Sequence, residues 1–114
     1  MSEPECVFCS RIERGEYQQT SVTTIVMFEP LNPVTPGHML FVPRGHFPDA
    51  RSGWTFGNAA LAAGQYAATR PEHANIITSI GEHATQSVYH LHVHYVPRRE
   101  GDGLALPWTG QKRT

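Results

Sequence analysis

The pattern of apolar and polar positions divides the chain into four strands and two helices. Apolar and β-branched residues dominate residues 20–28, 38–43 and 74–79, and polar and apolar residues alternate in 87–96, so each segment is predicted to be a strand. A short helix is expected at 5–14, and the alanine-rich segment 53–69 predicts a longer one. Segment 29–37 holds three prolines and a glycine and is predicted to be a loop. Because strands outnumber helices and the connections are too short for several βαβ crossovers, the predicted class is α+β with a mainly antiparallel sheet.

The fourth predicted strand lies in the stretch "SVYHLHVHYVPR" and carries histidine at every second position. Alternate residues of a strand point to opposite faces, so His90, His92 and His94 are expected to share one face. The other face, expected to turn toward the core, carries Tyr89, Leu91, Val93 and Tyr95. Trp54 and Phe56, at the start of the longer helix, are expected to pack in the core.

Three interpretations of the histidine row follow from its chemistry. It is a solvated strand face, or the histidines chelate a metal, or the imidazoles act on an anion. Chelation by the row needs a further ligand, and Glu82 and Glu100 are the nearby carboxylates in the sequence. In the third interpretation a neutral imidazole attacks phosphorus, while protonated neighbours hold phosphate oxygens or supply a proton.

Length, charge and cysteine content limit the class of protein. The 114 residues suit one domain covering 1–114, and a net charge of −1 gives no reason to expect nucleic acid or an anionic membrane as partner. No apolar run approaches the roughly 20 residues of a spanning helix, and the first residues do not resemble a signal peptide, so a cytoplasmic protein is expected. Cys6 and Cys9 form a C-x-x-C pair. In a reducing compartment such a pair is typical of half a metal site or of a redox pair.

Three sequence blocks resemble the histidine-triad (HIT) family of nucleotide-binding proteins. The family signature H-φ-H-φ-H-φ-φ, with φ apolar, is matched by "HLHVHYV" at residues 90–96. The block "NPVTPGHMLFVPRGH" (32–46) is similar to the family's turn, strand and basic-histidine pattern, and "CVFCSRIERGE" (6–16) is similar to the opening of bacterial members. The resemblance implies a five-stranded antiparallel sheet with two helices, a homodimer in which the two sheets run together, and a tight hairpin within residues 17–28.

The resemblance also implies a nucleotide hydrolase or nucleotidyl transferase acting on phosphoramidates, dinucleoside polyphosphates or related esters. His92 would attack the α-phosphorus to form a nucleotidyl-histidine that water then cleaves. The first and last triad histidines and the histidine of the P-G-H turn would support the reaction, and the residues expected to bind the substrate come from three segments. These supporting and binding residues are His90, His94, His38, Phe28, Leu31, Ser79, Gln86 and Ser87.

Some positions depart from the family pattern. Pro30 stands where many members carry a ribose-binding aspartate, Ser79 replaces a frequent asparagine, and Thr85 replaces a glycine of the phosphate loop. Nucleoside recognition is therefore expected to differ from that of other members. A nucleotide-binding regulatory protein with little turnover is the alternative function, and a metal-binding protein in which the triad chelates is a third. The tail residue Trp108 is expected either to pack or to shape specificity.

Bacterial relatives that resemble this pattern hold zinc with a C-x-x-C pair and two histidines. Carried over, the ligands would be Cys6, Cys9, His46 and His90, a closed set typical of structural zinc. The alternative is a pair of reduced cysteines without metal. A catalytic disulfide is less well supported, because no thioredoxin-like βαβ pattern surrounds the pair.

Overall fold

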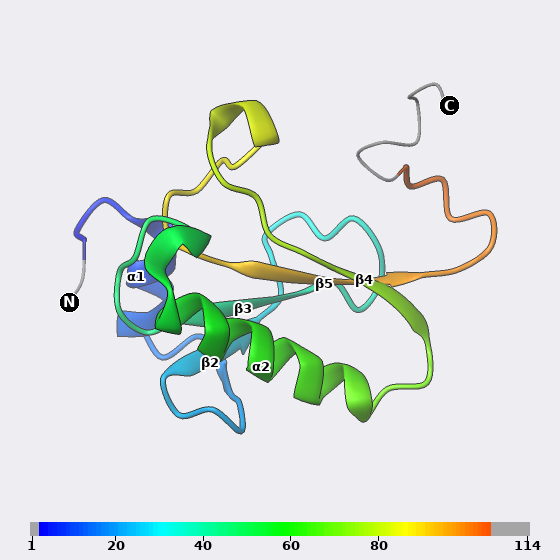
Figure 1. Ribbon diagram of the computed structural model, residues 1–114, viewed down its shortest axis with the longest axis horizontal. Coiled ribbons are helices and arrows are strands. Elements are labelled where there is room, and N and C mark those ends of the chain that lie inside the picture. The colour runs from blue at the N-terminus through cyan, green and yellow to red at the C-terminus, as the bar shows by residue number, and fades with distance from the viewer. Residues whose placement is uncertain (1–2, 106–114) are drawn as a thin grey trace.

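The computed structural model describes residues 3–105 and contains a single five-stranded sheet (Figure 1). The strands lie in the order β1-β2-β3-β5-β4, and every neighbouring pair is antiparallel. Trp108 lies outside the described residues. In chain order the elements are α1 (Val7–Glu13), β1 (Gln18–Gln19), β2 (Ile25–Phe28), β3 (Met39–Pro43), the 3-10 turn η1 (Ala50–Ser52), α2 (Trp54–Ala68), β4 (His73–Ile77), the 3-10 turn η2 (Glu82–Ala84) and β5 (Val93–Arg98). The predicted α+β class with a five-stranded sheet and two helices is confirmed.

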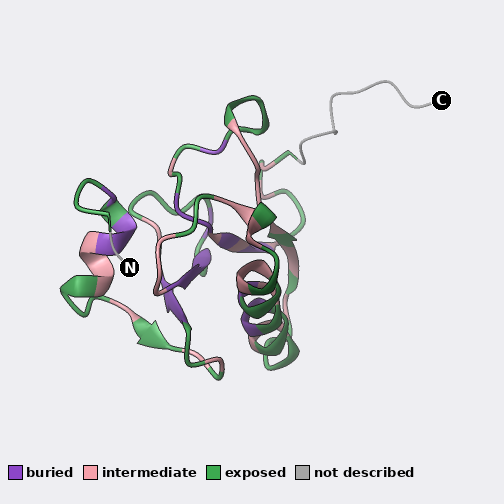
Figure 2. Cartoon of the chain, turned by 60° about the vertical axis from the view of Figure 1, so that its left-hand side comes forward, coloured by how far each residue is buried: buried purple, intermediate pink, exposed green. Residues whose placement is uncertain are grey.

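The two helices cover opposite faces of the sheet (Figure 2). All four residues of β2 are buried because alternate side chains enter different cores. Ile25 and Met27 pack with α2, whereas Val26 and Phe28 pack with α1. The triad region therefore lies on a strand layer that is buried from both sides.

Helix α2 packs against the sheet through three buried alanines and the partly buried Phe56. Alanine has the highest helix propensity, and its small side chain lets the helix approach the strands closely. Trp54 lies on the opposite face and is 91% exposed, so its predicted place in the core is wrong. The buried Ala59 is five positions further along the helix, and at 3.6 residues per turn this offset rotates Trp54 away from the sheet.

Two predicted strands have different bounds in the structure. Residues 20–28 do not form one strand, because the chain turns between β1 and β2 and pairs Gln18 with Met27. The short hairpin implied by the family resemblance is therefore confirmed. The strand predicted at 87–96 begins only at Val93, since upstream groups bind other segments: the Leu91 amide donates to the Phe47 carbonyl at 2.5 Å.

The late start of β5 changes where its residues face. Tyr89, predicted to face the core, is 49% exposed, whereas Leu91, Val93 and Tyr95 are buried as predicted. The strand also continues through Pro97 instead of ending before it. Pairing with β3 stops at Tyr95, so beyond that point β5 has only β4 beside it and the missing amide of proline costs no ladder bond. No helix within residues 3–105 is long and apolar enough to cross a bilayer.

Candidate active site and the adjoining metal cluster

A cavity of about 560 Å³ opens beside the last two triad histidines. It lies between the loop that contains η2, the end of β4, strand β5 and the segment that follows β5. None of its described lining residues is Asp, Glu, Lys or Arg, so its polar character comes from imidazole, hydroxyl and amide groups. The lining residues are Val34, His38, Ile77, Ser79, His83, Ala84, Thr85, Gln86, Ser87, His92, His94, Val96 and Ala105.

The central histidine is held as a neutral imidazole with one nitrogen free. Nδ1 of His92 lies 2.8 Å from the carbonyl oxygen of His90, which can only accept, so Nδ1 carries the proton. Burial lowers the pKa of His92, and the hydrogen bond to the His90 carbonyl opposes that shift. The Nε2 lone pair is therefore available as a nucleophile near neutral pH.

A chain of hydrogen bonds fixes the protons of two further histidines. The Val34 amide donates to Nδ1 of His38 at 3.1 Å, so the His38 proton is on Nε2. That Nε2 lies 2.9 Å from Nδ1 of His94 and donates to it, which leaves the His94 proton on its own Nε2. Burial, followed by the neighbouring His92 and His38, lowers the pKa of His94 to about 4. His94 is therefore a neutral donor beside the nucleophile.

The loop between Gly81 and Ser87 is closed by Gln86 from inside. Its side-chain oxygen accepts from the Gly81 amide at 2.9 Å, and its side-chain nitrogen donates to the Pro48 carbonyl at 2.7 Å. The Gln86 amide donates to the Gly81 carbonyl as well. Gln86 thus organises the loop, whereas Ser87 is exposed and lines the cavity, as does Ser79.

Two residues expected at the substrate, Phe28 and Leu31, do not line this cavity. Phe28 is buried beneath Arg11, whose guanidinium carbon lies 4.2 Å from the ring centroid. Leu31 is 90% exposed on the proline-rich loop. The covering by Arg11 was missed in the sequence, although its position three residues after Phe8 puts both side chains on one face of α1.

The side chains of four residues, His90 among them, form a compact cluster of possible metal ligands. The ligand atoms of Cys6, Cys9, His46 and His90 all lie within 4.8 Å of one another, and within residues 3–105 they are the one group of at least three possible metal ligands. The sulfur-to-Nδ1 distances are 3.3 Å for Cys6 to His90 and 3.4 Å for Cys9 to His46. A tetrahedral zinc site with ordinary Zn–S and Zn–N bonds needs roughly 3.5 Å between such atoms. The cluster therefore fits zinc.

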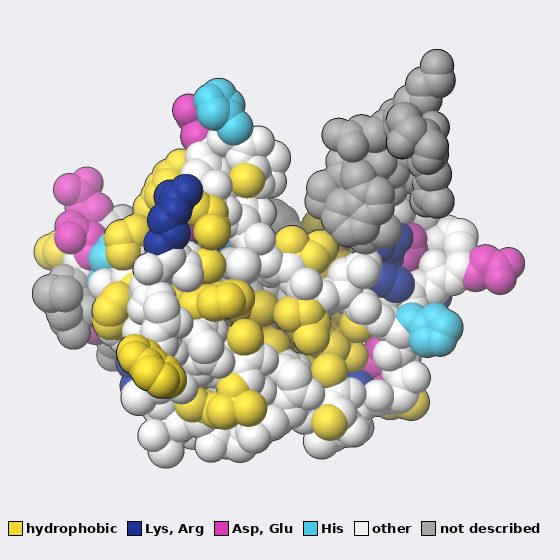
Figure 3. Space-filling model, viewed as in Figure 1, with side chains coloured by type: hydrophobic (Ala, Val, Ile, Leu, Met, Phe, Trp, Pro, Cys, Tyr) yellow, Lys and Arg dark blue, Asp and Glu magenta, His cyan; other side chains and the backbone are white. Residues whose placement is uncertain are grey.

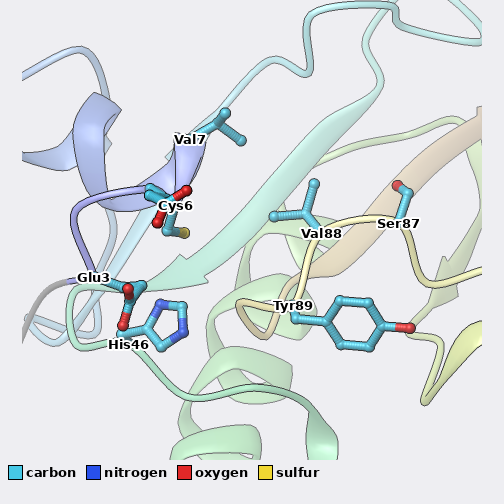
Figure 4. Close-up of a pocket in the computed structure, with 8 residues that line it drawn as sticks. Glu3, Cys6, Val7, His46, Ser87, Val88 and Tyr89 are labelled. Atoms are coloured by element: carbon cyan, nitrogen blue, oxygen red, sulfur yellow. The ribbon is translucent and has the colours of Figure 1, made fainter.

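The surroundings of the cluster favour a cation. Nε2 of His90 donates to the Pro43 carbonyl at 2.8 Å, so the lone pair of Nδ1 faces the two sulfurs. The Cys9 amide donates to the Cys6 sulfur at 3.4 Å and the Glu3 amide donates to the Cys9 sulfur at 3.3 Å, which stabilises thiolates. Burial raises the pKa of the Cys9 thiol, a cost that a bound cation offsets. Figure 4 shows Cys6 and His46 beside a cavity of about 350 Å³ that Glu3, Val88 and Tyr89 also line.

One residue joins the cluster to the cavity. The His90 ring belongs to the cluster, and its carbonyl holds the proton of His92 in place. His90 is fully buried, so the interpretation of the triad as a solvated face is wrong for this residue. The interpretation in which the triad itself chelates is not supported either, because within residues 3–105 the donors gather around the cysteines and not around His92 and His94.

The HIT domain family matches residues 19–101 of this sequence, a range that contains the histidine row and most of the sheet. The chain belongs to the HIT domain family. The match begins after α1, so the two cysteines precede the part that defines the family.

Two curated relatives of this HIT protein are named for an activity. An adenylylsulfatase, HINT3 of Arabidopsis thaliana, is 30% identical over 113 residues, which cover 88% of this chain and 55% of the relative. The chain thus spans about half the length of that relative. The adenosine 5'-monophosphoramidase HNT1 of Saccharomyces cerevisiae is 26% identical, with 94% of this chain and 72% of the relative covered.

A solved structure shares the fold of this HIT protein. The Zn-bound histidine triad family protein from Mycobacterium smegmatis superposes with a TM-score of 0.73 at 29% identity. The superposition covers 90% of this chain and 81% of that one. Its fold is shared almost throughout, and its description as zinc-bound applies to that protein.

Proposed function

We propose that this HIT protein is a nucleotide hydrolase or nucleotidyl transferase in which His92 attacks the α-phosphorus of its substrate. The observation that carries the proposal is the pairing of a free Nε2 on His92 with a proton on Nε2 of His94 beside one cavity. A bond forms between Nε2 of His92 and phosphorus, the bond to the leaving group breaks, and the leaving group takes the proton of His94. Water then attacks phosphorus and returns a proton to His94, the bond between phosphorus and His92 breaks, and the nucleoside monophosphate is released. Ser87 and nearby backbone amides would hold the phosphate oxygens.

Phosphoramidates are the substrates that this cavity favours over dinucleoside polyphosphates. The described lining residues offer no lysine or arginine to neutralise the several negative charges of a polyphosphate leaving group. An amine leaving group needs a proton, which His94 is placed to supply. The activity in the name of the yeast relative, a monophosphoramidase, is consistent with this choice.

The reaction is tested by mixing the protein with an adenosine phosphoramidate and following release of adenosine monophosphate. We expect release by the wild type, a nucleotidyl adduct on His92 in samples quenched with alkaline denaturant, and neither in His92→Asn. Calorimetry with adenosine monophosphate checks that the variant still binds nucleotide. Wild-type binding without release would favour the regulatory protein instead, and the departures at Pro30 and Ser79 keep that alternative open.

We propose zinc as the cation of the Cys6, Cys9, His46 and His90 cluster, in a structural role. All four ligands belong to the protein, so no position is left for a substrate. When bound, zinc supplies a cross-link between α1 and the sheet. The thiols must stay reduced for this, which is consistent with a cytoplasmic location. Elemental analysis of the purified protein should give one zinc per chain, and a zinc content near zero would reject the assignment.

A homodimer is our proposal for the assembly. The exposed stripe of α2 carries Trp54 and Leu61 with Gly57 and Gly64 beside them, and the whole helix has no charged residue. Each glycine costs about 1 kcal/mol of helix stability, and in one chain a Cβ at either position would meet no atom within 4 Å, so a close partner would explain both glycines. Figure 3 shows that charged side chains lie around the edge of this face and not at its centre. Sedimentation should show a dimer for the wild type and a monomer for Leu61→Arg. Val7→Arg, an exposed position of α1 on the other side of the sheet, should remain a dimer.

A further inference from the structure

The turn after β5 is organised around one arginine. The Arg98 guanidinium donates to the Asp102 carboxylate at 2.8 and 3.2 Å, to the Asn75 side-chain oxygen at 2.7 Å and to the Leu104 carbonyl at 2.7 Å. One side chain thereby links β4, β5 and the segment that follows β5. The side chains of Arg98 and Asp102 are only 23% and 6% exposed, so this pair is far better shielded than a surface ion pair.

Asp102 completes the turn from the other side. Its carboxylate also accepts from the backbone amides of Arg99 and Leu104, each at 3.0 Å. Gly101 and Gly103 flank it with φ angles of 72° and 76°, a conformation that lets the chain reverse within a few residues. The Arg98 hydrogen bond, with help from these amides, holds the pKa of Asp102 well below its usual range, so the carboxylate stays charged. We name this arrangement the Arg98–Asp102 clamp.

The clamp directs the chain back to the histidine cavity. Ala105, one residue after the clamped Leu104 carbonyl, lines the cavity together with His94 and Val96 of β5. The turn is also tied to the proline-rich loop, because Arg99 donates to the Thr35 hydroxyl at 3.3 Å. The neighbouring Val34 lines the same cavity, so two of its edges are connected through this turn.

We propose that the Arg98–Asp102 clamp is a positioning device that builds one wall of the substrate cavity by holding Leu104 and Ala105 in place. Nothing in the clamp reaches the reacting atoms, so it acts on binding and not on the chemical step. The inference rests on the proposed function, since it assumes that the histidine cavity takes the nucleotide substrate. The wall of the cavity next to the clamp would bind the uncharged part of the ligand, because Ala105, Val96 and Ile77 offer apolar surface there.

The test compares Asp102→Ala with Glu16→Gln, which removes the carboxylate charge from the exposed ion pair of Arg14 and Glu16. For Asp102→Ala we expect KM for the adenosine phosphoramidate and Kd for adenosine monophosphate to rise roughly tenfold, with kcat within about twofold of wild type. Hydrogen exchange at the Leu104 amide should accelerate in the same variant. Glu16→Gln should leave all of these values unchanged.

Each outcome decides between the proposals. Unchanged KM and Kd despite faster exchange at Leu104 would overturn the clamp's role in binding, and so would a fall in kcat alone. Wild-type protein that neither binds nor cleaves the nucleotide would reject the proposed function itself. If Asp102→Ala does not fold, Asp102→Asn retains an acceptor for the Leu104 amide, and the same shift of KM without kcat is expected at a smaller size.

Discussion

The two ends of the histidine row, His90 and His94, occupy opposite environments, although only three residues separate them. His90 is fully buried. Its Nδ1 lone pair faces two sulfurs, and its Nε2–H donates to the Pro43 carbonyl. His94 lines an open cavity, with its lone pair toward His38 and its proton available to a ligand. Burial is the main cause that lowers the pKa of both to about 4. One residue type with one protonation state thus lies in a cluster of possible metal ligands at one end and presents a proton to the cavity at the other.

The difference lies in which nitrogen is engaged by the protein. At His90 the proton is held on Nε2, so the lone pair of Nδ1 is available to a cation. At His94 the lone pair of Nδ1 is occupied, so Nε2–H is available to a leaving group. Between them His92 takes the third combination, a fixed proton on Nδ1 and a free lone pair on Nε2. Neighbouring acceptors and donors, not the histidine spacing, therefore assign the three roles.

Replacing each histidine separately gives the largest expected contrast. His92→Asn should reduce turnover by at least roughly 10³-fold while zinc content and melting temperature stay near wild type. His90→Asn should lose zinc and stability as well as turnover, because it removes a ligand and disturbs the His92 support. Kinetics, elemental analysis and thermal melts on the same preparations check both variants. Zinc loss in His92→Asn would contradict the separation of the two ends.

Cys9→Ser tests the His90 end of the row, where the possible metal ligands gather, without changing the cavity at the His94 end. The variant should lose the metal and about 3–4 kcal/mol of unfolding free energy at zinc concentrations of 100–1,000 times its Kd. Turnover of the folded fraction should fall much less than in His92→Asn, since the cavity residues are intact. Denaturant titration with and without a chelator provides the control, because chelated wild type should match the variant. Equal stabilities of the two proteins in zinc would argue against a structural metal.

Much of this arrangement could be predicted from the sequence. The β2 segment is an unbroken apolar run because its strand is buried on both sides, whereas histidine alternates with apolar residues up to the start of β5, and the helices follow from composition. The set Cys6, Cys9, His46 and His90 came from resemblance, and the structure brings these residues together. What the alternation did not reveal is that β5 starts at Val93, since that depends on bonds to distant segments such as the Phe47 carbonyl.

The remaining differences also have tertiary causes. The covering of Phe28 by Arg11 depends on how α1 docks, and the exposure of Trp54 depends on which face of α2 meets the sheet. Tautomers are equally invisible in a sequence, because they are set by acceptors such as the Pro43 carbonyl. A residue pattern gives the type of chemistry, whereas the packing assigns the atoms.

His38 offers a way to disturb the open end without touching the substrate's phosphorus. His38→Leu removes the donor that holds Nδ1 of His94, so kcat should fall roughly 10- to 100-fold with zinc retained. His38→Gln can still donate from its amide and should recover part of the loss. Single-turnover measurements separate this effect from product release. A His38→Leu variant with wild-type kcat would remove the hydrogen-bond chain from the mechanism.

The pH dependence of stability probes the same end. The pKa of His94 is about 4 in the folded protein against an ordinary 6.5, so between these values the unfolded chain binds more protons. The unfolding free energy should therefore fall as pH drops from 6.5 to 4, with no further contribution from His94 below 4. A Cys9→Ser background avoids loss of metal in acid, and adding His94→Asn should reduce the fall by on the order of 1 kcal/mol at pH 5. Parallel curves for the two proteins would mean that His94 is not held neutral by the fold.

Thr85 gives the smallest expected effect and concerns strain at the open end. It is the one non-glycine residue between 3 and 105 with positive φ, at 70°, and it lines the cavity next to the Gln86 side chain that closes the loop. A β-branched residue in this conformation is strained by roughly 1–2 kcal/mol, whereas glycine costs about 0.5–1 kcal/mol in chain entropy. Thr85→Gly should therefore raise the unfolding free energy by roughly 0.5 kcal/mol, measured in urea, and Thr85→Ala should gain less. None of the four possible metal ligands has a positive φ angle, so this strain is confined to the cavity side. A Thr85→Gly variant that is more stable but binds nucleotide more weakly would indicate that the strain positions the loop for its ligand.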